Sequence, residues 1–266
     1  MAEFLPQGRW AADAPVAGGP LMAAEIAPLR YSLLPSEVER YQSAGRDAEE
    51  AVRSVALTVS RGQSENQVAQ ALMAAAQERG LWVVVCLVAA DERIALYRHP
   101  LPTDRRIERI AMLVLGAERH GLYVSLSRLV SFGPLSGELK ARHLAVCRVD
   151  AAFNHGTVGG RTWGDVFREG MAAYAREGLP DEWKLHHQGG PAGYQPREFK
   201  VTPAETRRVV ENQPAAWNPS ITGTKCEDTM LVQTGGNVFL TAARDWPMLC
   251  VEAGGKEYLR PDILIR

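Results

Sequence analysis

Two adjacent histidines ahead of a glycine-rich turn are the residues of this sequence best suited to chemistry. His186 and His187 come directly before residues 188–196, which contain the run Gly-Gly-Pro-Ala-Gly. An acidic residue, Glu227, follows later in the chain, next to a predicted strand. An imidazole that titrates near neutral pH can take a proton from water and return it to a leaving group. The pattern therefore indicates where a hydrolytic reaction would occur, but it does not identify the reaction.

The composition is that of an ordinary globular protein. The chain has 266 residues, a formal net charge of −1, 46% hydrophobic residues and 23% charged residues. A net charge near zero gives no reason to expect nucleic acid or an anionic membrane as a partner. No apolar stretch has the length of a membrane span, and the N-terminus lacks the pattern of a signal peptide. The four cysteines are far apart and share no CxxC spacing, so we expect free thiols and a cytoplasmic protein.

The chain divides into a short lead-in and one large domain. Residues 1–36 are rich in Ala, Gly and Pro and have no sustained period, which predicts an N-terminal arm that could pack on a partner subunit. Residues 37–266 are long enough for a single domain with a sizeable core. Ser36 and Glu39 have the spacing of a capping box, which predicts that the first helix begins there and continues to about residue 60.

The remaining elements alternate between helices and strands. Ser64 and Gln67 predict a second capped helix, which Gly80 would end. The other predicted elements are strands over residues 82–88, 110–115, 122–130, 229–234 and 238–241 and helices over residues 135–153 and 162–177. We expect the first of these strands, a continuous apolar run, to be buried. A helix pair followed by a sheet, twice over, predicts an internally duplicated α+β domain.

Five segments carry a resemblance to a known family. They are residues 60–65, 97–100, 113–128, 186–198 and 227–232. In their order and residue types they resemble the pita-bread fold of creatinase, Xaa-Pro aminopeptidase and methionine aminopeptidase. The resemblance extends over residues 37–242 and implies a helix pair with a curved antiparallel sheet, present in duplicate.

The resemblance also implies that most metal ligands have been lost. Peptidases of that family hold two metal ions with two Asp, one His and two Glu. In the register of the resemblance, the two aspartates fall on Val114 and Ser125 and the first glutamate falls on Asn218, so that only His186 and Glu227 remain. One histidine and one carboxylate cannot supply the anionic oxygens that a two-ion centre needs, and we expect no metal cofactor.

Creatinase is similar to this chain in a useful respect, because it works without metal. The resemblance implies that His186 is a general acid and base and that Glu227 orients the substrate or stabilises charge. The expected substrate contacts are His99, Asn218, Arg197, His187 and Ser125.

Each of these residues also has a structural interpretation. Lys225 could neutralise Glu227 and make the pair structural, and Arg197 could pair with the adjacent Glu198. On an extended segment His187 would point away from His186, which favours a supporting role. By the same alternation, a strand would bury one of the neighbours Glu227 and Asp228 and expose the other. The resemblance implies that Glu227 is the buried one and Asp228 the exposed one.

The favoured hypothesis is a metal-independent hydrolase of a small C–N substrate such as an amide, an amidine or a dipeptide-like molecule. A second hypothesis is a non-catalytic module that binds a peptide or another ligand. A third is a hydrolase with a rebuilt single-metal site made by His186, Glu227 and either His99 or His187. Homodimerisation is expected from the resemblance, whereas the substrate depends on loops that one sequence does not reveal.

Overall fold

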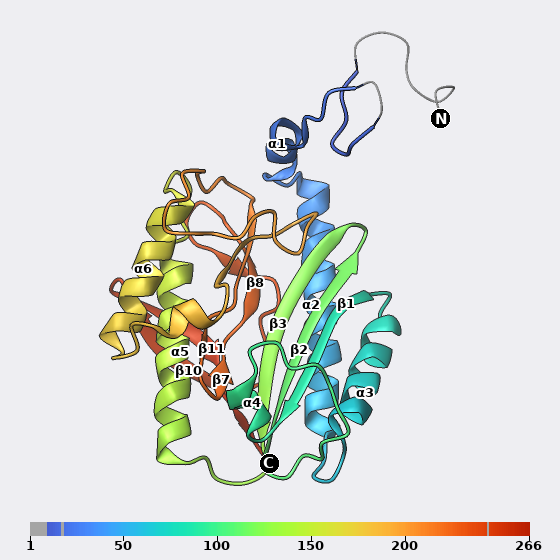
Figure 1. Cartoon of the computed structure of the whole chain (residues 1–266), viewed down its shortest axis with the longest axis vertical. Coiled ribbons are helices and arrows are strands. Elements are labelled where there is room, and N and C mark those ends of the chain that lie inside the picture. Colours follow the sequence, from blue (N-terminus) through green and yellow to red (C-terminus); the bar gives the residue numbers. More distant parts are fainter. Residues whose placement is uncertain (1–9, 17–18, 244) are drawn as a thin grey trace.

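The computed structural model describes residues 10–16, 19–243 and 245–266, and it has two halves that each combine a helix pair with a sheet. One half holds α2 and α3 beside β1, β2 and β3, and the other holds α5 and α6 (Figure 1). The helices are α1 (Ala23–Ile26), η2 (Ala27–Arg30), α2 (Pro35–Thr58), α3 (Glu65–Gln77), α4 (Arg93–Leu96), α5 (Gly137–Gly156), α6 (Trp163–Arg176) and η3 (Glu182–Leu185). The two long helix pairs lie where the sequence predicts them.

Two four-stranded sheets form the frame of the molecule. Their strand orders are β1-β2-β3-β12 and β4-β5-β8-β9, and all neighbours are antiparallel except β12, which is parallel to β3. The first sheet contains β1 (Trp82–Ala90), β2 (Ile110–Arg119), β3 (Leu122–Ser131) and β12 (Leu264–Ile265). The second contains β4 (Gly189–Pro191), β5 (Pro214–Trp217), β8 (Asp228–Leu231) and β9 (Val238–Phe239). Two hairpins complete the fold, formed by β6 (Ser220–Ile221) with β7 (Thr224–Lys225) and β10 (Met248–Ala253) with β11 (Lys256–Pro261).

The hairpin of β2 and β3 connects the two halves. Its turn consists of His120 and Gly121, both with positive φ (55° and 81°), as the tightest hairpin turns require. The amide of Ser125 on β3 donates to the hydroxyl of Thr229 on β8, and the amide of Ser127 donates to the carbonyl of Glu227. The first sheet thus continues into the second along β3.

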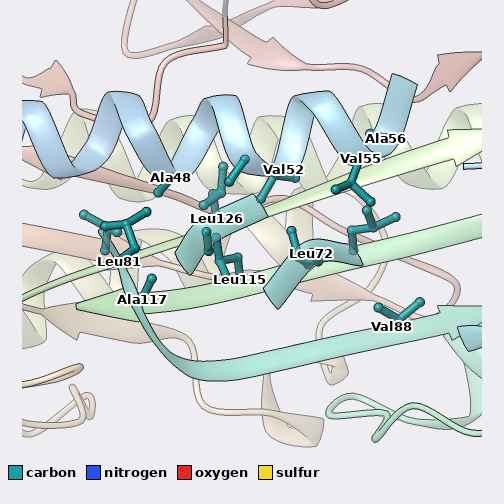
Figure 2. Close-up of a cluster of buried hydrophobic side chains, with 14 of the residues drawn as sticks. Ala48, Val52, Val55, Ala56, Leu72, Leu81, Val88, Leu115, Ala117 and Leu126 are labelled. Atoms are coloured by element: carbon teal, nitrogen blue, oxygen red, sulfur yellow. The ribbon is translucent and has the colours of Figure 1, made fainter. Parts of the chain in front are cut away.

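Alternation along β3 directs every second side chain toward the helices. Leu122, Val124 and Leu126 are fully buried and belong to the cluster that packs against α2 and α3. Figure 2 shows this cluster, with Val52 on α2, Leu72 on α3 and Leu126 on β3 directed at one another. The intervening residues of β3 therefore face away from the helices, toward the other half of the molecule.

The two predicted helix starts have different outcomes. Ser64 caps α3 as predicted, because its hydroxyl accepts from the Gln67 amide while the Gln67 side chain accepts from the Ser64 amide. The predicted capping box of Ser36 is wrong, since α2 begins one residue earlier at Pro35. Proline fits the first helical position, where its missing N–H would have no partner, and the Glu37 carboxylate accepts from the amide of Leu34 instead.

The first strand is less buried than its apolar sequence predicts. Trp82 is 69% exposed, and Val84 and Val85 are also exposed, whereas residues 87–90 are buried. The reason is that β1 lies at the edge of its sheet and, among the strands that the structure describes, pairs with β2 alone. A continuous apolar run does not distinguish an edge strand from a central one.

Part of the predicted N-terminal arm contacts the large domain of the same chain. The arm includes residues 1–9 and 17–18, which lie outside the described residues. Near its end, the guanidinium of Arg30 forms a 2.8 Å ion pair with Glu198, whose side chain is buried. Glu198 is thus paired with the arm rather than with its neighbour Arg197. None of the helices in the described residues combines the length and the apolar character that crossing a membrane requires.

Candidate active site

A cavity of about 300 Å³ lies where β1, β2 and β3 face the loops of the other half. Its apolar wall consists of Val84, Val85, Leu87, Val114, Leu115, Gly116 and Val124. Its polar wall consists of His99, Tyr123, Ser125, His187, Arg197, Lys200, Asn218, Lys225 and Glu227, with Pro196 beside Arg197. A mostly apolar cavity with a few converging polar groups is typical of a small-molecule site.

Four of the five positions that the resemblance assigns to metal ligands converge on this cavity. Val114, Ser125, Asn218 and Glu227 all line it. Val114 and Ser125 come from the paired strands β2 and β3, and the Asn218 amide donates to the carbonyl of Gln188, just after the histidine segment. Of these four side chains Glu227 alone carries a charge.

Glu227 is buried and held by two cations. Its Oε2 lies 3.0 Å from the Lys225 ammonium and accepts from the Ser127 hydroxyl at 2.6 Å, while its Oε1 accepts from Arg197 at 3.3 Å. Burial would raise the pKa of this carboxyl, but Lys225 and Arg197 outweigh burial and hold the pKa below its usual value of 4.5. Glu227 is therefore an ionised carboxylate with both oxygens already engaged.

The prediction that Asp228 would be exposed is wrong. Asp228 is as buried as Glu227, because two arginines on other strands neutralise it. Arg128 on β3 contacts Oδ1 at 2.9 Å, and Arg260 on β11 contacts Oδ2 at 2.7 Å. Alternation still directs the two carboxylates to opposite sides, but both sides are interior to the protein.

Three imidazole rings gather beside the cavity. His99 and His186 face each other with 3.0 Å between their Nε2 atoms, and their ring centroids are 4.5 Å apart. The ring of His187 stacks on that of His186 at 4.6 Å, which contradicts the prediction that His187 points away. The alternation argument fails here because the regular strand β4 begins only at Gly189.

The histidine environment favours neutral rings. Burial is the largest cause that lowers the pKa of all three, and the positive charge of Lys225 adds to it. For His187 the pKa falls to about 4, with Arg197 as the next cause after burial. The Nδ1 atoms of His186 and His187 are buried without a hydrogen-bond partner among the described residues. A neutral imidazole with an unused nitrogen can accept a hydrogen bond or bind a ligand through that nitrogen.

The five predicted substrate contacts all lie on the cavity wall, namely His99, Asn218, Arg197, His187 and Ser125. Within the described part of the chain, His186 is not among the lining residues and reaches the cavity through His99. Sequence reasoning missed Lys200 and Tyr123. Tyr123 could have been found from its alternation with Ser125, whereas Lys200 follows Arg197 in an irregular loop where no period applies.

The residues present do not fit a two-ion carboxylate centre. Such a centre needs several anionic oxygens around each pair of ions, and Glu227 is the single carboxylate on the cavity wall among the described residues. That carboxylate is already bound by Lys225 and Arg197. Two protein cations thus lie beside the carboxylate that the resemblance assigns to metal.

Comparison with known proteins gives a family match and several similar solved structures. The family model described as metallopeptidase family M24 matches residues 39–234. A prolidase from Pyrococcus furiosus superposes with a TM-score of 0.75 at 20% identity, covering 84% of this chain and 68% of that one. An X-Pro aminopeptidase from Thermotoga maritima MSB8 gives 0.77 at 19% identity, with 92% and 67% covered. A dipeptidase from Mycobacterium ulcerans gives 0.78 at 19% identity, with 93% and 64% covered.

The chain thus spans about two thirds of the length of these solved proteins. No sequence among the curated proteins matches it. The structural likeness confirms the predicted pita-bread fold, in which helices and antiparallel sheets combine. Because the family model covers most of the chain, this protein belongs to metallopeptidase family M24.

Proposed function

We propose that this protein hydrolyses a C–N bond in a small substrate without the two-metal centre of its family. Membership of family M24 supports a peptidase-type hydrolase that acts on C–N bonds. The observation that carries the metal-independent part is the buried contact of Lys225 and Arg197 with Glu227. Fixed positive charge in a site of low polarity can stabilise the oxyanion that develops during hydrolysis.

The charge of the cavity wall supports an anionic substrate. Among the described residues, Arg197, Lys200 and Lys225 contribute three positive charges to the wall against the one carboxylate of Glu227. The Nε of Arg197 is buried and has no acceptor among the described residues. A carboxylate-bearing amide, amidine or dipeptide-like molecule would supply the missing acceptor, and its apolar part would fit the wall formed by β1 and β2.

Proton transfer in this proposal belongs to the histidines. Water attacks the substrate carbon, its proton passes to a neutral imidazole, and the imidazolium then returns a proton to the nitrogen as the C–N bond breaks. His99 is on the cavity wall, and His186 supports it through the 3.0 Å contact between their Nε2 atoms. Glu227 holds Lys225 and Arg197 in place for the oxyanion.

The test is turnover by chelator-treated, tag-free protein on a panel of N-acyl amino acids, amidino acids and dipeptides. His99→Ala or His186→Ala is expected to reduce kcat/KM by at least about 100-fold, the usual contribution of a positioned acid or base. His120→Asn, in the exposed hairpin turn, is the matched control and should retain full activity. Unchanged turnover in both site variants, or turnover that appears only after metal is added, would contradict the proposal.

A second candidate is a ligand-binding module without catalysis. It is favoured by the complete engagement of Glu227, which leaves neither carboxylate oxygen free in this structure. This candidate predicts saturable binding of a panel compound by calorimetry, without its conversion, and weaker binding by Arg197→Met.

A further inference from the structure

The three histidines beside the cavity come from two separate segments and converge with their ring nitrogens. His99 lies in the loop after α4, and His186 and His187 lie just after η3. One nitrogen from each ring lies within 4.8 Å of the other two. Such convergence of three rings is more than a hydrogen-bonded pair requires, because His186 and His99 already satisfy each other at 3.0 Å.

The spacing of His99 and His186 is close to that of two ligands of a metal site. Bonds of about 2.0–2.1 Å in a tetrahedral arrangement place neighbouring nitrogens about 3.3 Å apart. The Nε2 atoms of His99 and His186 are therefore within a few tenths of an ångström of that separation. His187 would need to approach further, and its Nδ1 is a buried nitrogen with no partner among the described residues.

We propose that His99, His186 and His187 bind one divalent transition-metal ion of the borderline class, such as Zn²⁺ or Co²⁺, through three imidazole nitrogens. Imidazole ligands select such ions over Mg²⁺ or Ca²⁺, which prefer oxygen. The site differs from a carboxylate-based two-ion centre because its ligands are neutral nitrogens. It also differs from a site that uses Glu227, since that carboxylate is bound by Lys225 and Arg197.

The surrounding charge determines the fourth ligand. Lys225 and Arg98 act on His186, and Arg197 and Lys200 act on His187, in each case as positive charges. A bare dication is disfavoured among these groups, and an anion in the fourth position relieves the repulsion. Because His99 and His187 line the cavity, that position faces the space where an anionic ligand would lie.

The proposed metal site does not depend on the proposed hydrolase activity, but both use the imidazole rings of His99 and His186. A bound ion would occupy the nitrogens that acid–base catalysis requires. The metal would then inhibit the metal-independent reaction. Metal binding and turnover by chelator-treated protein therefore succeed or fail separately.

The experiment is a titration of tag-free, chelator-treated full-length protein with Co²⁺ alone, followed by calorimetry and by the visible absorption of tetrahedral Co²⁺. One equivalent is expected, and acetate should tighten the binding. His99→Ala and His187→Ala should each weaken it by more than about 100-fold, since removal of only an outer partner of a ligand costs about 10–100-fold. His120→Asn and His155→Ala, which change histidines outside the cluster, should bind as the unchanged protein does.

His186 is buried, so His186→Ala could fail to fold, and exposed His99 carries the test. No binding of Co²⁺ by the folded protein would overturn the inference. Equal binding by the unchanged protein and by His99→Ala would overturn it as well. So would the binding of two equivalents of Co²⁺ by both His99→Ala and His187→Ala.

Discussion

At the scale of single residues, the site is defined by which charges are buried together. Glu227 and Lys225 are both about 96% buried and only 3.0 Å apart. Burial of an ion costs several kcal/mol unless a partner compensates it, and Glu227 compensates the buried charge of Lys225. The contact thus explains how a lysine comes to lie beside the carboxylate that the resemblance assigns to metal.

The pH dependence of stability follows from the lowered pKa of Glu227. A carboxyl whose pKa is lower in the folded than in the unfolded state binds fewer protons when folded. It contributes stability above its unfolded pKa, near 4.5, and that stability is lost as the pH falls through the folded pKa. We expect the free energy of unfolding, measured with urea, to decline below about pH 4.5.

Glu227→Gln separates this residue from other carboxyls. At pH 7 the variant should be less stable by about 3 kcal/mol, because Lys225 and Arg197 keep buried charge without a counterion. Its stability should also fall less steeply than that of the unchanged protein between pH 5 and 3. Parallel curves for the two proteins would show that Glu227 does not titrate with a lowered pKa.

At the scale of elements, local chemistry at the helix ends decides where the long helices begin. Ser64 and Gln67 exchange hydrogen bonds at the start of α3, and the neighbouring Glu65 is fully buried. α2 begins at Pro35, whose fixed φ suits the first position of a helix. Loss of either signal would lengthen or fray a helix that packs on the first sheet.

Ser64→Ala tests the cap. The variant should lose about 1 kcal/mol of stability, since the amide of Gln67 loses its acceptor. Ser36→Ala is a matched control, because Ser36 is exposed and α2 begins before it. The measurement is the free energy of unfolding of both variants, from chemical denaturation under the same conditions. Equal losses would mean that the Ser64 hydroxyl has no capping role.

At the scale of the whole molecule, the two halves meet closely where α2 crosses the segment after β9. Gly45 on α2 lies so near Leu240 that an added Cβ would be 2.4 Å from the carbonyl oxygen of that residue. Buried ion pairs across the interface add to this contact, among them Arg128 with Asp228. The cavity depends on this arrangement, because its walls come from both halves.

Gly45→Ala is therefore expected to destabilise the protein, although alanine is the better helix former by about 1 kcal/mol. Overpacking against a backbone oxygen costs about 1–3 kcal/mol, and we expect a net loss near 2 kcal/mol. The added methyl of Gly137→Ala, at the start of α5, meets no atom of the described residues within 4 Å, and this variant should be neutral or stabilising. Thermal and urea unfolding of Gly45→Ala and Gly137→Ala measures the stability of each variant. Equal stability of the two variants would refute the close contact at Gly45.

The sequence by itself determined the order of the elements and the identity of the polar segments. Period, capping residues and the turn at Gly121 act over a few residues, so they could be read without a structure. The same local signals, with the resemblance, led to the positions Val114, Ser125, Asn218 and Glu227, which line one cavity.

The sequence offered Lys225 as a partner of Glu227, and their ion pair is present. Tertiary structure decided the charge partnerships between distant segments. Asp228 is buried because Arg128 and Arg260 arrive from other strands, and Glu198 is bound by Arg30 across 168 positions of the chain. His187 joins His99 and His186 because the chain is irregular before β4. These partnerships depend on electrostatic contacts between distant segments, and no periodicity within a segment encodes them.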